Sequence, residues 1–125
     1  TGAWKDFDLA GLTQTLNNGT RSIYGNLNIP STGGTYTAGA SATTMAGTGG
    51  QTTVTTNGRS IPFPITFSGT GKTFQLAGAL TFSGTTTQAI LTLTSGILDL
   101  NNFTVTASRF NSSSTNDRSI LFGAY

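Results

Sequence analysis

The sequence predicts an all-β protein whose single module, residues 1–125, is a parallel β-solenoid with about six rungs of about 19 residues. Three observations predict this fold class. Thr, Gly, Ser and Asn make up about half of the chain, and Glu, a favoured residue of helix surfaces, is absent. Short segments such as LTLTSGILDL alternate apolar and polar residues with a period of two. Related phrases recur at that rung length or at a multiple of it.

The rungs follow one another along the chain with glycine-marked corners. A glycine precedes a short alternating segment in GNLNI, GALTF and GILDL, at residues 25–29, 78–82 and 96–100. Blocks of one rung length open at Thr66, Thr85 and Thr104, so we expect these threonines to stack in one column of parallel strands. The alternative fold is an antiparallel β-sandwich with hairpins at the Asn-Gly pairs 18–19 and 57–58.

One short phrase of the sequence occurs three times, as NNGTRSI, TTNGRSI and STNDRSI. The arginines of the three copies are Arg21, Arg59 and Arg118. We interpret the phrase as the same corner of the solenoid in different rungs, with its isoleucine starting the next inward strand. Each arginine would then donate hydrogen bonds to the carbonyl groups of its own turn, and Asp117 would be a local partner of Arg118. The other interpretation is a stripe of arginines that binds a sulfated or acidic surface glycan.

The segment ILTLTSGILDLNNFTVTASRFNSSSTNDRSILFG, residues 90–123, resembles the β-helix repeat segments of phage tail fibres and bacterial surface or adhesin proteins. A weaker copy is DLAGLTQTLNNGTRSIYG, residues 8–25. The resemblance implies a structural or adhesive module of an extracellular fibre, in a phage fibre or virion appendage. The alternative role is a secreted bacterial adhesin or an extracellular filament subunit. Either role implies an extracellular or virion-surface location.

The sequence does not predict an enzyme. Only four carboxylates are present, at Asp6, Asp8, Asp99 and Asp117, and we expect them to be scattered. Glycan-cleaving enzymes need a pair of carboxylates, or a base with a cation, that converge on one groove. The absence of His and Cys removes the common nucleophile and zinc constellations. Asp99 near two asparagines suggests either a weak calcium site or a hydrogen-bonded corner, and we favour the corner. We therefore predict no catalytic residue, metal or cofactor.

Aromatic and threonine side chains provide further candidates for surface binding. Trp4, Tyr24, Tyr36 and Tyr125 either stack on sugars or pack at the ends of rungs. Four phenylalanines alternate like core residues, namely Phe67, Phe74, Phe82 and Phe103. Threonine pairs begin at residues 13, 35, 53 and 92, with a related segment at 73. Stacked pairs would resemble an ice-binding face, but a solvated β-surface also favours threonine.

Charge and hydropathy limit the other partners. The net charge is +2 and the cations are scattered, so no nucleic-acid-binding surface is expected. No apolar run of about 18 residues is present, so we expect no membrane span. The chain does not begin with Met, and it is read either as a mature product or as a segment of a longer chain.

The C-terminal strand is the predicted assembly edge. Ile120, Leu121 and Phe122 form an apolar strand without Pro or a charge cluster, and the end rungs of a solenoid expose unpaired backbone groups. WKDFDL near the start contains charges and is the better candidate for a cap. We expect the edge at Ile120 to Phe122 to be covered by another subunit or by a continuation of the chain.

Overall fold

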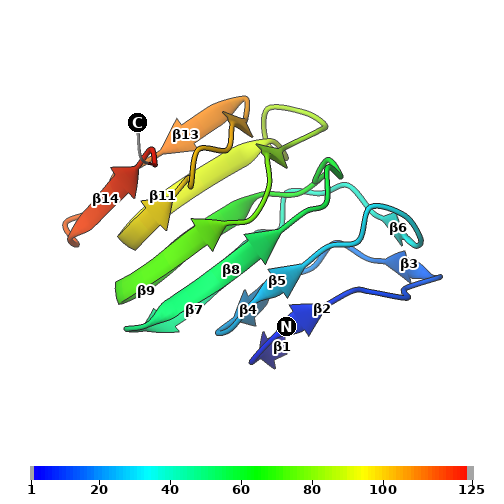
Figure 1. Ribbon diagram of the computed structural model, residues 1–125. Helices are drawn as coiled ribbons and strands as arrows, with labels where there is room; N and C mark the ends of the chain where they lie inside the picture. Colours follow the sequence, from blue (N-terminus) through cyan, green and yellow to red (C-terminus); the bar gives the residue numbers. More distant parts are fainter. Residues whose placement is uncertain (1, 124–125) are drawn as a thin grey trace.

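The structure is a computed structural model that describes residues 2–123. It consists of parallel strands that follow one another along the solenoid in sequence order (Figure 1). The chain winds into about five turns, here called coils, and residues 109–123 begin a sixth. Every strand pair within the described residues is parallel and joins one coil to the next. The predicted parallel β-solenoid is therefore confirmed, and the antiparallel sandwich with Asn-Gly hairpins is wrong.

The strands form three faces of the solenoid. The first face consists of β1 (Gly2–Trp4), β4 (Arg21–Ile23), β7 (Thr43–Thr48), the first halves of β9 (Ile65–Leu76) and β11 (Ile90–Asp99), and β13 (Arg109–Asn111). The second face consists of β2 (Phe7–Asp8), β5 (Leu27–Asn28), β8 (Gln51–Thr55), the second halves of β9 and β11, and β14 (Arg118–Leu121). Four two-residue strands pair on the third face: β3 (Thr15–Leu16) with β6 (Thr35–Tyr36), and β10 (Leu80–Thr81) with β12 (Val105–Thr106).

The coils differ in length and do not keep the predicted constant period. The residues in register on the first face are Gly2, Arg21, Thr43, Ile65, Leu91 and Phe110, and the interval between Ile65 and Leu91 is the longest of the series. Thr66 consequently pairs with Thr92. Thr85 lies in a turn instead, and Thr104 precedes β12. The predicted Thr66, Thr85 and Thr104 column is wrong because the fourth coil carries an extended turn before β11.

The core is a stack of inward side chains contributed by successive coils. On the first face Ile23, Met45, Phe67 and Leu93 lie in register, and on the second face Leu27, Val54 and Leu76 do so. All seven are at most 2% exposed. The alternation of the strands directs these residues inward and their neighbours outward. Each coil thus contributes one layer to a continuous apolar column. The apolar side chains of one coil are therefore buried against those of the neighbouring coils.

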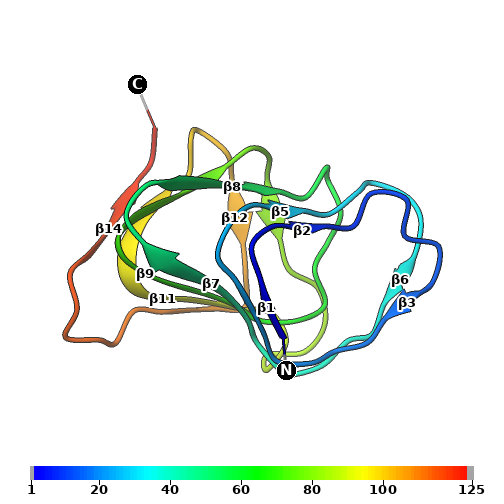
Figure 2. The same cartoon turned by 90° about the horizontal axis from the view of Figure 1, so that it is seen from below.

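The cross-section of the solenoid shifts from its first coils to its last (Figure 2). The first two coils extend to one side through the loops that carry β3 and β6, and the last coil extends to the opposite side through residues 112–117. In the long strand β11 the corner is made by Gly96, whose φ is 91°. A Cβ atom there would collide with the carbonyl oxygens of Gly69 and Lys72. This close approach of two coils therefore requires glycine.

Candidate functional site

The C-terminal end of the solenoid is an open apolar hollow. Its volume is about 480 Å³, and apolar side chains from the fifth and sixth coils line it, including Leu98, Leu100, Phe103, Phe110, Ile120 and Phe122. Phe110 is 46% exposed and Phe122 is 62% exposed. β13 and β14 each pair with β11 on one side, and no strand within residues 2–123 pairs with their other edges. This end therefore combines apolar side chains with unpaired strand edges.

The corner after β11 gives this hollow its shape. Asn101 and Asn102 adopt left-handed backbone conformations, with φ values of 47° and 63°, which asparagine tolerates better than most residues. The carboxylate of Asp99 accepts a hydrogen bond from the backbone N–H of Asn101 at 2.9 Å. The side-chain amide of Asn101 in turn donates to the carbonyl of Leu76 in the preceding coil. Asp99 thus forms a hydrogen-bonded corner, and the chain turns sharply to present Phe103 at the end.

The predicted assembly edge lies at this end of the molecule. Ile120 and Leu121 belong to β14 and Phe122 follows it. Ile120 packs partly into the core, whereas Leu121 pairs with Asp99 and is 49% exposed. The edge predicted from the sequence did not include Phe110. Phe103 was predicted to be a core residue, which is wrong because it is 39% exposed. Both belong to the end surface because no complete coil within the described residues covers them; the other three predicted core phenylalanines are buried.

The N-terminal end carries a second, smaller hollow. Its volume is about 260 Å³, and Gly2, Trp4, Phe7 and Leu16 are among the residues that line it. The Trp4 indole is 46% exposed and lies 5.5 Å from the Phe7 ring, measured between centroids. This indole occupies the space in which a side chain at Gly2 would lie. The segment WKDFDL contains the charges of Lys5 and Asp6. The N-terminal end of the solenoid is nevertheless apolar near the first strand.

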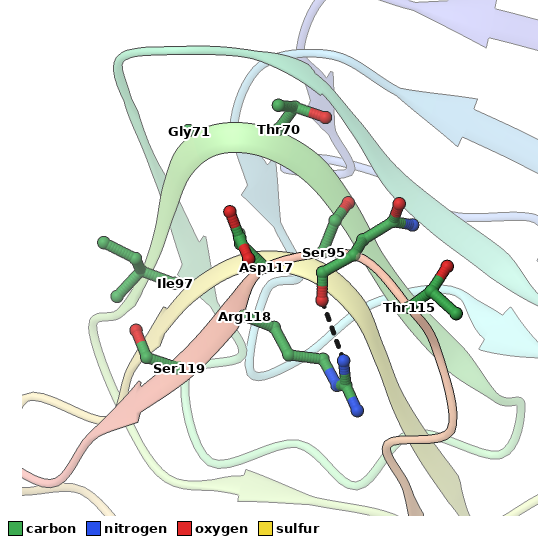
Figure 3. A pocket seen from close by; sticks show the side chains of 10 residues that line it. Thr70, Gly71, Ser95, Ile97, Thr115, Asp117, Arg118 and Ser119 are labelled. Atoms are coloured by element: carbon green, nitrogen blue, oxygen red, sulfur yellow. Dashed lines mark hydrogen bonds between the residues drawn. The ribbon is translucent and has the colours of Figure 1, made fainter.

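A polar groove of about 770 Å³ runs beside the corner of the fourth, fifth and sixth coils (Figure 3). Hydroxyl-bearing and small residues line much of it, including Thr70, Ser95, Gly96, Thr115 and Ser119. Asp117 and Arg118 lie on the same wall, but their charged ends point in different directions (Figure 3). The predicted pairing of Asp117 with Arg118 is therefore wrong.

Arg118 closes the loop that precedes its own strand. Its guanidinium donates to the Ser112 carbonyl and hydroxyl oxygens, both at 2.6 Å, and to the carbonyl oxygens of Ser114 and Asn116. Five donors in a rigid fork suit this arrangement of acceptors. The predicted role of an arginine that stabilises its own turn is confirmed at this position.

Arg21 also donates a hydrogen bond to the turn that precedes it, but its side chain lies inside the solenoid. It donates to the Asn17 carbonyl at 2.8 Å and to the Thr43 hydroxyl at 3.2 Å. Its guanidinium carbon lies 5.6 Å from the Phe7 ring centroid and 5.5 Å from that of Phe63. Burial lowers the pKa of Arg21 below its ordinary value because desolvation disfavours the charged form. This arginine is therefore largely buried, at the wall of the N-terminal hollow, and does not belong to an exposed stripe.

Arg59 stabilises a loop of the preceding coil. Its guanidinium donates to the carbonyl oxygens of Gly33 and Gly34 and lies 4.2 Å from the Tyr36 ring centroid. Arg21 lies on the first face, Arg59 follows β8, and Arg118 begins β14 on the second face. The interpretation of the repeated phrase as one common corner, and the alternative of an arginine stripe, are both wrong because the coil lengths differ.

The tyrosines differ in accessibility. Arg59 stacks on the Tyr36 ring, and Phe63 meets that ring edge-on, so Tyr36 is packed into the structure. Tyr24 follows β4 and is 49% exposed, which leaves it available at the surface. Tyr125 lies outside the described residues. Of the predicted sugar-stacking tyrosines within residues 2–123, Tyr24 is therefore the accessible one.

The carboxylates are spread over several coils. Asp6 accepts a hydrogen bond from the backbone N–H of Asn26, and Asp8 accepts one from the Asn28 amide. Asp99 accepts one from Gln75, which itself accepts one from Gln51. Across the described residues, no three potential metal-ligating carboxylates come together. Three of the four aspartates thus hold neighbouring segments or coils together.

The threonine pairs fall on separate columns. Thr15 pairs with Thr35, and their hydroxyl oxygens lie 2.6 Å apart. Thr53 pairs with Gln75 on the second face, and Thr92 pairs with Thr66 on the first. The pairs therefore do not form one flat face.

Residues 2–123 hold no helix with the length and apolarity that a membrane crossing requires. No family model, curated protein or solved structure matches this chain.

Proposed function

We propose that this chain is a non-enzymatic structural and adhesive module of an extracellular fibre, in a phage tail fibre or another virion appendage. The observation that carries the proposal is the apolar surface of the last coils, where Phe110 and Phe122 lie beside edges of β13 and β14 that no strand within residues 2–123 pairs. A solenoid builds length by adding coils, and end coils that are left uncovered recruit further strands. In a fibre, either another subunit or a continuation of the same chain would cover these edges.

The arrangement of the carboxylates supports a non-enzymatic role. Asp6, Asp8 and Asp99 accept hydrogen bonds from other segments of the chain and hold coils or corners in place. Glycan hydrolysis requires two carboxyl groups on either side of one bond. We expect a broad panel of polysaccharides to yield no reducing ends or unsaturated products with this protein. Turnover that Asp99→Asn abolishes would make Asp99 catalytic and overturn the proposal.

Immunogold electron microscopy tests the fibre role directly. Antibodies raised against residues 1–125 should label projecting fibres on released virions in negative stain. Labelling of cell-surface filaments without virion labelling would favour a secreted bacterial adhesin or filament subunit instead. Labelling of neither structure, with the protein recovered as a free monomer, would contradict both.

The polar groove is the feature that favours adhesion as the second task. Exposed hydroxyl-bearing residues line it, namely Thr70, Thr115 and Ser119, and such groups exchange hydrogen bonds with sugar hydroxyls. The donors of Arg118 are occupied by its own loop, so the hydroxyl groups would carry recognition. Binding to a glycan array should weaken in a Thr115→Val, Ser119→Val variant, which changes two exposed residues of the groove. Binding that survives this change would remove the groove from the proposal.

A further inference from the structure

The charges around the polar groove indicate which class of glycan it takes. Its walls come from the corners of three successive coils: Thr70 and Gly71 from the fourth, Ser95 to Ile97 from the fifth, and residues 115–119 from the sixth. Its volume of about 770 Å³ falls within the range of about 300–1,000 Å³ of small-molecule sites. We propose that this groove binds an uncharged glycan and rejects acidic and sulfated ones. This inference rests on the proposed adhesive function and names its ligand class.

Arg118 is the cationic side chain of the groove, and its charge is already engaged. It donates four hydrogen bonds to the loop that precedes it, and the acceptors are the hydroxyl and carbonyl oxygens of Ser112 and the carbonyl oxygens of Ser114 and Asn116. Four of the five N–H groups of the guanidinium are thereby directed into the loop. An anionic ligand would have to displace these acceptors, so Arg118 does not serve as an anion site.

Asp117 supplies the charge that is left for a ligand. Its backbone carbonyl oxygen accepts a hydrogen bond from the N–H of Gly96 at 3.0 Å, which fixes the residue at the corner. The residue is exposed, and its carboxylate and the Arg118 guanidinium point in different directions (Figure 3). No hydrogen bond from residues 2–123 reaches this carboxylate. An acidic or sulfated glycan would bring a second anion against it, and like charges repel.

The uncharged side chains match the mixed character of a sugar ring, which has apolar C–H groups on its faces and hydroxyl groups at its edge. Ile97 lies in register with Ser119 of the next coil, so an apolar and a hydroxyl side chain are about 4.8 Å apart along the groove. Thr70 and Thr115 add exposed hydroxyl groups. A ring that lies on Ile97 would exchange hydrogen bonds with Ser119 and donate to Asp117.

An amino sugar is the competing ligand, because its ammonium group would be attracted to Asp117. Ion pairs between exposed groups contribute little, since water and salt screen them. A sugar diol instead donates one hydrogen bond to each oxygen of the carboxylate, and hydrogen bonds to a charged acceptor are among the stronger ones. The groove offers a single carboxylate among several hydroxyl groups, so the observations favour the uncharged ring.

Binding to an array of neutral, uronic-acid, sulfated and amino oligosaccharides tests this inference when it is measured at low and at high NaCl concentration. Neutral glycans should bind most strongly, and their binding should change less than about twofold over a roughly tenfold rise in NaCl, because no ion pair is formed. Sulfated or uronic-acid glycans as the strongest ligands would overturn the inference. Preferred binding of amino glycans that is lost at high salt would overturn it as well.

Variants of Asp117 identify the group that selects the ligand. Asp117→Asn keeps the shape of the side chain but removes its charge, and it should weaken binding of a neutral glycan roughly 10–100-fold. Asp8→Asn removes the same charge from the first coil, outside the groove, and should bind like the wild type. Asp117→Lys should gain affinity for sulfated glycans. Unchanged neutral-glycan binding by Asp117→Asn would show that the carboxylate does not contact the ligand, and would overturn the inference.

The Thr115→Val, Ser119→Val variant separates this inference from the proposed function. If the wild type prefers acidic glycans and this variant loses that binding, the adhesive groove stands and the uncharged ligand class is refuted. If no class of glycan binds the wild type, both the adhesive groove and this inference are refuted. The fibre role is judged independently of either result by gold labelling.

Discussion

Lys72 reaches across one complete coil to Tyr24, and its Nζ donates a hydrogen bond to the Tyr24 carbonyl oxygen at 2.6 Å. Tyr24 follows β4 in the second coil, and Lys72 lies on β9 in the fourth. The intervening coil contributes Gly47, where an added Cβ would lie 3.1 Å from the ammonium nitrogen. Lys72 is only 6% exposed, so its stem is packed within the solenoid. This single side chain links three coils.

Replacing Lys72 with Met should lower the free energy of unfolding by about 1.5–3 kcal/mol, the range for a hydrogen bond to a charged group. The Met side chain preserves most of the apolar stem but leaves the Tyr24 carbonyl without this donor. Urea unfolding followed by circular dichroism measures the loss. Lys5→Met, at an exposed position, should stay within about 0.5 kcal/mol of the wild type. An unchanged unfolding midpoint for Lys72→Met would show that the link contributes no stability.

Gly47→Ala should destabilise the protein more than Gly49→Ala. Both glycines have positive φ values, 118° and 57°, so each alanine strains the backbone. At Gly47 the new methyl group also crowds the Lys72 ammonium, whereas the space around Gly49 is open. We expect a loss of about 1–3 kcal/mol at Gly47 and about 1 kcal/mol at Gly49. Equal losses in thermal unfolding would argue against the contact with Lys72.

Tyr36→Phe should raise the free energy of unfolding at neutral pH by about 1 kcal/mol, because the Tyr36 hydroxyl carries an uncompensated desolvation cost. This hydroxyl is buried and has no hydrogen-bond partner among the described residues. Tyr24→Phe is the matched control, because it removes a hydroxyl from an exposed ring. A destabilised Tyr36→Phe variant would indicate that the hydroxyl does make a stabilising contact.

The same tyrosine should make stability fall at alkaline pH. Burial raises the pKa of Tyr36 above its ordinary value, while the charge of Arg59 acts in the opposite direction. In the unfolded chain Tyr36 therefore ionises at a lower pH than in the folded protein. The contribution that neutral Tyr36 makes to the free energy of unfolding is therefore present below about pH 10 and is lost as the pH rises above that value. Tyr36→Phe should lose less stability than the wild type across this range in urea titrations; identical pH profiles would contradict this.

Arg118→Lys should loosen the loop of residues 112–117 without disturbing the central coils. A lysine ammonium cannot reproduce the hydrogen bonds that the Arg118 fork makes to Ser112, Ser114 and Asn116. We expect faster amide hydrogen exchange in this loop and a stability loss of about 1–3 kcal/mol. Arg109→Lys, at an exposed position on β13, is the control. Unchanged exchange in the loop would argue against its closure by Arg118.

The solenoid was predictable because its signals are local. The alternation in LTLTSGILDL reappears as β11, with Leu91, Leu93 and Leu98 buried. The register was not predictable from a fixed period. Coil lengths depend on the turns, such as residues 83–89 before β11, and turn residues are not constrained to a constant number. Thr66 and Thr85 each open a block of the predicted rung length, but they occupy a strand and a turn.

The candidate site was predicted in part for the same reason. Ile120 and Phe122 were identified from an apolar strand near the end of the sequence, and they do lie at the end of the solenoid. Phe110 was missed because its context, ASRFNSS, shows no apolar run. It joins the site only through its pairing with Leu91, a contact between two successive coils. Such a contact becomes visible once the coil lengths are known.

The unequal strand lengths described for the three faces have a consequence for how the protein unfolds. β9 and β11 are the two longest strands and pair with each other over both faces, whereas each of β1 to β6 is very short. In a stack held together by nearest-neighbour contacts, the cost of detaching a coil depends on its own ladder. The fourth and fifth coils should therefore nucleate folding, and the first two coils should detach earlier under mechanical load or denaturant.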